Sequence, residues 1–280
     1  MSGLINQSGA KSGIIQGYQP YRNANPENRV TSGMTYERHN RTYPNYDRPG
    51  DGPYTPDIYT SCLIRSDSTN NNTHFSDFGF WRHPVTRAGN LKHDTAYTSA
   101  LPKLGQTGMN FHGDNSYLSM PDHSAWHQGT EWTIDFWFRG SKMYGGQHTN
   151  SSNGNPRDTM FLVNGGSFGF YGYSTSTNWK ETNAGTTDDA MHHYAIVVMG
   201  NDQDNGWSTD SRKRRILLFK DGKLLANHDW GNGGGFNGNT YWIGKFKESN
   251  TADSWASGVL MEYRFSVGIA RWTNDFKIWI

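Results

Sequence analysis

An alternating segment near the middle of the chain constrains the fold more than any other feature. In WTIDFWFR, residues 132–139, a large apolar side chain occupies every second position, which is the period of a β-strand with one buried face. That face carries Trp132, Ile134, Phe136 and Phe138, and the opposite face carries Thr133, Asp135, Trp137 and Arg139. The segment therefore predicts a strand, with Asp135 on its outward face beside Arg139 or another cation.

Further strand-like runs occur along the chain, and turn signals separate them. Their sequences are YTSCLIRS, GMNFHGDNSYLSM, HHYAIVVMG, RRILLFKDGKLLA, TYWIGKF and SGVLMEYRFSVGIARW. Asp221-Gly222 predicts a two-residue hairpin turn, and the apolar end FKIWI predicts a packed C-terminus. Because no convincing helix interrupts these runs, the sequence predicts an all-β fold, an antiparallel β-sandwich of the jelly-roll type.

Composition supports this fold class and narrows the range of partners. The chain is 34% hydrophobic but 14% aromatic, and it holds 33 glycines, as expected of a β protein with many turns. Its formal net charge is +1, so overall charge predicts no nucleic-acid partner. No run approaches the ~20 apolar residues of a membrane span, so we expect no membrane insertion. A single cysteine, Cys62, excludes an internal disulfide.

Residues 1–56 differ in texture from the rest of the chain. Gly, Pro, Asn, Tyr and Arg dominate them, and prolines at positions 20, 26, 44, 49, 53 and 56 exclude a long helix. The sequence therefore predicts two parts: an extended N-terminal anchoring arm over residues 1–56 and the β-sandwich over residues 57–280.

The strand-like segments, taken in order from about residue 59 to residue 276, resemble the laminin-G-like, concanavalin A-like jelly roll. The resemblance rests on LGQTGMNFHGDNSYLSMPDHSAWHQGTEWTIDFWFRG, on the histidine pair before a buried strand, on the KDGK hairpin, and on YWIG and GIARWTNDF. It implies that His192 and His193 are structural. Two positions depart from the family pattern, because Met261 replaces a usual acid and Met191 replaces a usual Trp. These departures predict altered packing rather than a different fold.

The opening GLINQSGAKSGII, residues 3–15, resembles the N-terminal arm of structural proteins from marine tailed phages. The resemblance implies an arm that orders on contact with a virus particle. The predicted anchoring residues are Leu4, Ile5, Ile14, Ile15, Tyr18 and Tyr21. The first functional hypothesis is therefore a non-enzymatic bacteriophage virion structural protein, such as a capsid decoration protein or a head or tail appendage. It would be made in the host cytoplasm, bind other virion proteins through the arm, and form a homo-oligomer or multicopy assembly on the particle surface.

The candidate catalytic residues do not form a complete catalytic pair in the sequence. Jelly-roll glycosidases need two carboxylates beside the scissile bond, about 5–5.5 Å apart in retaining enzymes, whereas the strand of Asp135 carries one acid. His192 and His193 are adjacent, so on a strand they point to opposite faces and cannot easily share a metal. We therefore expect no enzymatic activity, and a carbohydrate-active enzyme is the third hypothesis.

Calcium is the one cofactor that the sequence suggests, because it binds oxygen ligands in acidic loops. The loop NDQDNGWSTD offers Asp202, Asp204 and Asp210. Its glycine does not fit the EF-hand spacing, and a solvated loop is the alternative. The Asp114-Asn115 turn is a second candidate. The basic run SRKRR, residues 211–215, favours an edge strand protected by charge, with contact to an acidic neighbouring subunit as the alternative.

Glycan binding is the second functional hypothesis. Tryptophans in loops rich in Asn, Gly and Asp suit sugar stacking, and they suit packing against another protein equally well. The candidates are Trp179, Trp207, Trp230 and Trp255. A glycan-binding tail-fibre adhesin that attaches to host surface glycans is therefore the alternative to a purely structural virion protein.

Overall fold

The computed structural model describes residues 56–97, 107–126, 131–147, 159–171, 179–185, 190–200, 215–229, 240–247 and 253–278. Within these ranges the secondary structure consists of strands β1 to β16 and two short 3-10 turns, η3 (Thr95–Tyr97) and η4 (Ser124–Trp126). No helix in the same ranges is long and apolar enough to cross a membrane. The all-β prediction is confirmed.

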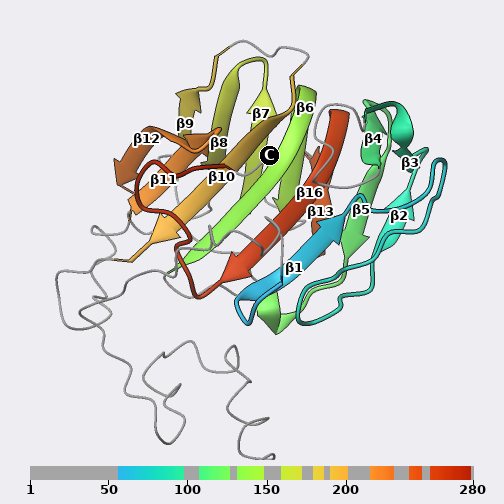
Figure 1. Cartoon of the computed structure of the whole chain (residues 1–280), viewed down its shortest axis with the longest axis horizontal. Helices are drawn as coiled ribbons and strands as arrows, with labels where there is room; N and C mark the ends of the chain where they lie inside the picture. The colour runs from blue at the N-terminus through green and yellow to red at the C-terminus, as the bar shows by residue number, and fades with distance from the viewer. Residues whose placement is uncertain are drawn as a thin grey trace, which may run out of the picture. The chain divides into compact units, whose positions relative to one another are not determined.

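Strand β6 (Trp132–Gln147) connects two layers of antiparallel strands (Figure 1). Its first half pairs with β10 and β16, and its second half pairs with β7 and β13. Gly140 lies between the halves with a φ of 146°, and a Cβ at this position would lie 2.5 Å from the Cα of Gly258. The glycine therefore permits the close crossing of β6 and β16 at which the sheet curls.

The first layer has the strand order β12-β11-β10-β6-β16-β1. Its other strands are β12 (Lys223–Asp229), β11 (Arg215–Lys220), β10 (His192–Met199), β16 (Ser257–Val267) and β1 (Thr60–Arg65). The β11–β12 hairpin turns at Asp221 and Gly222, with φ of 52° and 75°. Positive φ at both central residues is the geometry that a two-residue Asp-Gly hairpin favours, so this turn is confirmed.

The second layer has the order β9-β8-β7-β6-β13-β5-β2. Its other strands are β9 (Trp179–Asn183), β8 (Ser167–Tyr171), β7 (Thr159–Asn164), β13 (Tyr241–Ile243), β5 (Tyr117–Met120) and β2 (Thr86–Ala88). Strand β4 (Gly108–His112) pairs with β16 and with β3 (Lys92–Asp94). A separate hairpin joins β14 (Lys245–Lys247) to β15 (Asp253–Trp255).

Aromatic rings fill the space between the two layers. Phe136 of β6 lies 5.2 Å from Phe161 of β7, measured between ring centroids, and Phe168 of β8 lies 5.1 Å from Tyr194 of β10. Strands β8 and β10 are not hydrogen-bonded to each other, so the second contact joins opposite layers. The aromatic-rich composition is therefore explained by this core, in which the largest fully buried side chains are all aromatic.

The segment 268–278 covers the outer face of the first layer, and Figure 1 shows it crossing in front of β10 and β11. Trp272 and Phe276 stack at 4.1 Å and pack on the buried side chains of these strands. Ile278 packs against a second cluster, formed by Leu63, Trp137 and Met261. The predicted packing of the C-terminus is confirmed as far as Ile278.

Both departures from the jelly-roll pattern lie in this second cluster. Met261 is one of its buried members, and Met191 packs against it from the side. An acid at position 261 would be buried in this cluster without a compensating charge among its members, which is unfavourable. Both methionines therefore contribute to the packing of one apolar cluster.

Candidate functional site

Asp135 lies on the face of β6 opposite the core rings, but it is 0% exposed. Arg264 donates from Nε to Oδ1 at 2.9 Å and from Nη2 to Oδ2 at 3.0 Å. His193 Nε2 lies 3.4 Å from Oδ2, and the ring of Trp272 lies 5.8 Å from the Arg264 guanidinium carbon. The partner of Asp135 is therefore the other cation, Arg264, and not Arg139, because the β6–β16 register sets Arg264 directly opposite Asp135.

Electrostatics fixes Asp135 in its ionised form. Burial raises its pKa, but the charge of Arg264 and the hydrogen bonds from His193 and Arg264 lower it more, and the net pKa lies well below the usual range of an aspartate. A glycosidase acid must be accessible and must exchange a proton with substrate. Asp135 does neither, so the enzyme hypothesis loses the residue on which it depended.

The histidine pair has two separate partners. His192 Nδ1 lies 2.6 Å from Asp221 Oδ2 in the hairpin turn, and the His193 amide donates to Asp221 Oδ1 at 3.0 Å. The His193 ring contacts Asp135 on the other side of the strand. The two rings therefore lie on opposite faces, and they tie β10 to its neighbours as structural residues.

No group of three or more His, Cys, Asp or Glu side chains in the described ranges is close enough to hold a metal ion. Asp114 accepts hydrogen bonds from Ser116 Oγ at 2.9 Å and from Asn90 Nδ2 at 3.4 Å, which accounts for it as a turn residue. Asp202, Asp204 and Asp210 lie outside the described residues, and calcium binding there stays a prediction.

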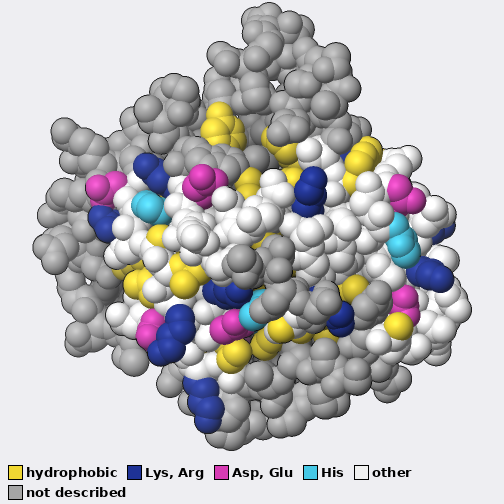
Figure 2. All heavy atoms as spheres, turned by 90° about the horizontal axis from the view of Figure 1, so that it is seen from above, with side chains coloured by type: hydrophobic (Ala, Val, Ile, Leu, Met, Phe, Trp, Pro, Cys, Tyr) yellow, Lys and Arg dark blue, Asp and Glu magenta, His cyan; other side chains and the backbone are white. Residues whose placement is uncertain are grey.

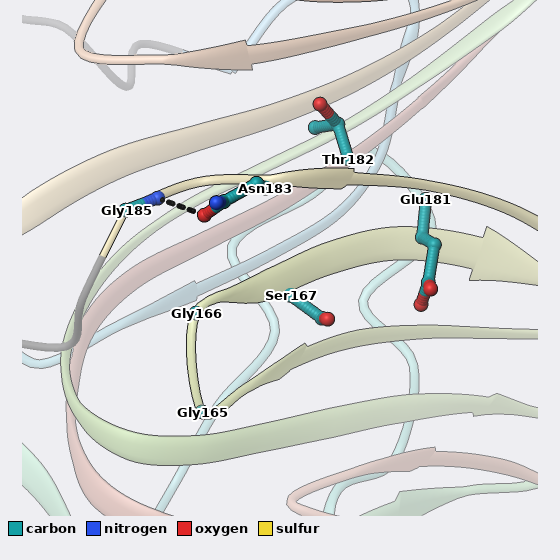
Figure 3. Close-up of a pocket in the computed structure, with 7 residues that line it drawn as sticks. All are labelled: Gly165, Gly166, Ser167, Glu181, Thr182, Asn183 and Gly185. Atoms are coloured by element: carbon teal, nitrogen blue, oxygen red, sulfur yellow. Dashed lines mark hydrogen bonds between the residues drawn. The ribbon is translucent and has the colours of Figure 1, made fainter.

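A polar cleft of about 650 Å³ lies where the β7–β8 turn meets β9 and the residues after it (Figure 3). It is lined by Gly165, Gly166, Ser167, Glu181, Thr182, Asn183 and Gly185. None of these described residues has a large apolar side chain, and Glu181 is the one carboxylate among them. The cleft therefore offers hydrogen-bonding groups and backbone rather than a hydrophobic surface.

Hydrogen bonds fix the walls of this cleft. The Ala184 amide donates to the Gly166 carbonyl at 2.7 Å, and the Gly185 amide donates to Asn183 Oδ1 at 2.8 Å. Lys220 Nζ of β11 donates to the Ala184 carbonyl at 2.8 Å. The end of β9 is therefore held in place before any ligand arrives, which lowers the entropic cost of binding.

Strand register brings the polar side chains of the cleft together. Ser167 lies opposite Asn183, and Gly169 lies opposite Glu181, in the β8–β9 ladder. In Figure 3 the side chains of Ser167 and Glu181 point to the same side of the ribbon, and that of Thr182 points to the other. Glu181 and Asn183 are both exposed. A hydroxyl, a carboxylate and an amide therefore meet solvent within one strand pair.

A second surface feature gathers aromatic rings around a lysine. Tyr117, Trp242 and Trp255 lie around Lys245, and all four side chains are partly buried. Lys245 Nζ lies 5.0 Å from the ring centroid of Tyr117, 5.0 Å from that of Trp242 and 4.8 Å from that of Trp255. The rings of Tyr117 and Trp255 stack with centroids 5.8 Å apart. We call this group the aromatic cage.

The predicted glycan-binding tryptophans do not lie together in one site. Trp255 belongs to the aromatic cage, and Trp179 is the first residue of β9, opposite Tyr171 in the ladder and two positions before Glu181. Trp207 and Trp230 lie outside the described residues, as do all the predicted anchoring residues of the arm. Their roles stay predictions.

Of the basic run 211–215, Arg215 is the one residue that the structure describes. Arg215 forms an ion pair with Asp229 and donates from Nε to Asn227 Oδ1 at 2.6 Å, both across the β11–β12 ladder. Strand β11 lies between β10 and β12, so the predicted edge strand is wrong at this residue. On the face drawn in Figure 2, acidic and basic side chains of the described residues are interspersed, without a broad patch of one sign.

Sequence reasoning missed the cleft residues and three of the four cage residues. The run NGGS, residues 164–167, is a turn signal and gave a local hint of the glycine wall. Nothing in the sequence pairs that turn with Glu181 and Asn183, because the pairing depends on cross-strand register.

No family model matches the chain, and no curated protein matches its sequence. Among solved structures, the chain is similar to the receptor-binding domain of the botulinum neurotoxin C/D mosaic serotype, with 7% identity and a TM-score of 0.48 over 74% of this chain and 48% of that chain. It is also similar to the binding domain of botulinum neurotoxin DC in complex with SialylT, with 10% identity and a TM-score of 0.49 over 78% of this chain and 49% of that chain. The chain thus matches about half the length of these structures.

Proposed function

We propose that the β-sandwich is a non-enzymatic glycan-binding module and that the cleft between the β7–β8 turn and β9 holds a sugar. The observation that carries the proposal is the lining of this cleft, which consists of glycine backbone and small polar or acidic side chains. Its volume of about 650 Å³ falls within the range of roughly 300–1,000 Å³ that small-ligand sites occupy.

The chemistry of the lining suits a sugar better than the alternatives. Sugar hydroxyls both donate and accept hydrogen bonds, and Glu181, Asn183 and Ser167 supply acceptors and donors within one strand pair. An apolar ligand would bury little area against the described lining residues, because none of them has a large apolar side chain. Hydrolysis by the usual mechanism needs two carboxylates, and Glu181 supplies the one carboxylate among the described residues of the lining, so binding without turnover is the proposed activity.

The test is a screen of the full-length protein on a panel of immobilised oligosaccharides, followed by calorimetric titration of the strongest ligand. Glu181→Gln and Ser167→Ala should each weaken that ligand by about tenfold, as expected for the loss of a charged or neutral hydrogen bond. Asp67→Asn is the matched control, since Asp67 is an exposed carboxylate outside the cleft lining. Equal affinity of Glu181→Gln and the unaltered protein would refute the cleft as the site.

We further propose that the N-terminal arm attaches this module to a virus particle, on the strength of the GLINQSGAKSGII sequence. In this proposal the arm orders on contact and buries its apolar pairs, Leu4-Ile5 and Ile14-Ile15. The protein would then be a virion surface protein that displays a glycan-binding sandwich, either as capsid decoration or as part of a tail fibre.

Co-sedimentation tests the anchoring role separately from glycan binding. Full-length protein and residues 57–280 are mixed with particles that lack the protein, and the particles are pelleted. We expect full-length protein alone to pellet. Pelleting of both proteins, or of neither, would contradict the anchoring role and leave the cleft hypothesis unaffected.

A further inference from the structure

We propose that the aromatic cage of Tyr117, Trp242 and Trp255 binds a quaternary ammonium group, and that Lys245 fills the cage until such a ligand displaces it. The Lys245 ammonium lies 4.8–5.0 Å from the three ring centroids, inside the ~6 Å at which an aromatic face attracts a cation. The lysine therefore marks the position and the sign of charge of the group that the rings accept. This inference is independent of the cleft and of the arm.

The fold sets the rings in place through strand register. Trp242 of β13 pairs with Ser119 of β5, the strand that begins at Tyr117. Lys245 of β14 pairs with Trp255 of β15. The rings thus come from three different strands, and backbone pairing of those strands sets the positions from which the rings converge on Lys245.

The backbone conformation of Gly244 positions the next residue, Lys245, beside the rings. Its φ is 94°, its amide donates to the Tyr144 carbonyl at 2.7 Å, and its carbonyl accepts from the Ala256 amide at 2.8 Å. A Cβ at Gly244 would lie 2.2 Å from the Phe111 ring, so another residue would not fit without displacing that ring. This fixed turn sets the backbone of β14 immediately after β13 and holds Lys245 beside the cage.

The lysine is an exchangeable occupant. All four side chains of the group are partly exposed, so water reaches its rim. A primary ammonium is strongly hydrated and sits on a flexible four-carbon stem. A quaternary ammonium has no N–H group, so it gives up no N–H hydrogen bonds to water when it binds. Recognition of quaternary ammonium ligands is the main functional use of such ring arrangements. A quaternary group therefore gains the attraction of the rings at a smaller desolvation cost than the lysine does.

Lys245 competes with an external cation for the aromatic cage. If the lysine occupies the cage, the apparent affinity for an external cation is reduced by the fraction of molecules in which the cage is open. Removing the lysine's charge should therefore strengthen binding. A ligand that used Lys245 as a counter-ion for its own negative charge would show the opposite change.

The experiment is calorimetric titration of choline into the full-length protein and its variants. We expect Lys245→Gln to bind choline about threefold more tightly or better, since the internal competitor is gone. Trp255→Ala should weaken binding about tenfold, and Trp255→Phe should retain part of the affinity because it keeps a ring. The Phe variant and circular dichroism of both variants separate loss of the ring from loss of the fold.

The controls distinguish the cage from simpler explanations. Lys223→Gln removes the same charge at a lysine that is 72% exposed and pairs with Asp275, and it should leave choline affinity unchanged. The uncharged isostere 3,3-dimethylbutanol should bind at least about tenfold more weakly than choline, because it lacks the charge that ring faces attract. Weaker choline binding by Lys245→Gln, equal binding of the isostere, or absence of choline binding by both the unaltered protein and Lys245→Gln would each overturn the proposal. Glu181→Gln should not alter choline binding, which keeps this test separate from that of the cleft.

Discussion

Two carboxylates, one in each layer of the sandwich, have opposite surroundings. Asp135 on β6 is completely buried, and both of its oxygens are bound by Arg264. Glu181 on β9 is exposed and lines a cleft whose other described members are glycines and small polar residues. Both residues lie on strands within antiparallel ladders, so strand position alone does not decide which acid is structural and which is available to a ligand.

The difference comes from what covers each strand. The segment 268–278 packs over β10 and β11, and its Trp272 lies beside Arg264, which excludes water from the ion pair. Opposite Glu181 in the β8–β9 ladder stands Gly169, which has no side chain. The comparison teaches that a covered carboxylate becomes part of the fold's internal bonding, while one beside glycine keeps its hydrogen-bonding capacity for solvent and ligands.

The largest expected effect is at Asp135. Asp135→Asn removes the carboxylate that binds the buried guanidinium of Arg264 through both oxygens and should lower the free energy of unfolding by about 3 kcal/mol or more, measured by urea denaturation. The double variant Asp135→Asn/Arg264→Met should recover part of the loss, because it removes both charges of the pair and leaves neither partner buried alone. A loss below about 1 kcal/mol would show that the pair is not desolvated as described.

Acid should destabilise the protein through buried groups, and His83 is the clearest case. Burial and the nearby His123 lower the pKa of His83 from 6.5 to about 4, and its ring stacks on Trp126 at 4.1 Å. Between pH 6.5 and 4 the unfolded chain binds this proton and the folded chain does not, so stability falls as the pH falls through that window.

His83→Phe removes that titration and is the matched test. We expect the slope of unfolding free energy against pH between pH 6.5 and 4 to decrease, by a total of roughly 2 kcal/mol across the window. Below pH 4 a further loss should remain in the variant, because Asp135 has a depressed pKa in the folded state and its contribution is lost only as the pH falls through that value. Identical slopes for the two proteins would contradict the burial of a neutral His83.

Two neighbouring glycines give a smaller and graded effect at the cleft. A Cβ on Gly166, at φ 99°, would lie 2.9 Å from the Gly185 carbonyl oxygen, whereas a Cβ on Gly165, at φ 57°, would meet nothing within 4 Å. Gly165→Ala should cost about 1 kcal/mol from backbone strain alone, and Gly166→Ala should cost about 2 kcal/mol. Thermal unfolding measures both, and equal losses would show that the wall of the cleft is not closed by Gly185.

Sequence pattern predicts those parts of the fold that depend on local periodicity and turn chemistry. The alternation in residues 132–139, the Asp221-Gly222 turn and the packed C-terminal end are all present in the structure. Pattern does not predict that β6 continues to Gln147 and bends at Gly140, because that bend depends on the close approach of Gly258 from a strand more than a hundred residues away. Pattern likewise named Arg139 first as the partner of Asp135, because Arg264 lies opposite Asp135 only through the register of β6 and β16.

The sites depended even more on contacts between distant residues. The sequence identified Trp179 and Trp255 as candidate ligand residues, but the prediction that they lie in loops is wrong, because they belong to strands β9 and β15. Glu181, Asn183 and Ser167 carried no signal of their own. They form a cleft because the register of β8 and β9 sets Ser167 opposite Asn183. The cage likewise needs residues from β5, β13, β14 and β15. Residue type can suggest which side chains bind ligands, while tertiary pairing decides which of them act together.

The smallest expected effect on stability is at Glu181, and it tests the contrast with Asp135 most directly. Glu181→Gln makes the same chemical change as Asp135→Asn, from carboxylate to amide, but at an exposed residue. Its free energy of unfolding should stay within about 0.5 kcal/mol of the unaltered protein, because an exposed acid gives up no buried partner when its charge is removed. Urea denaturation of both amide variants, side by side, measures the contrast directly. A loss at Glu181 comparable to that at Asp135 would mean that its carboxylate belongs to the internal bonding of the fold. In that case it would not be free to bind a sugar, and the cleft would need another explanation.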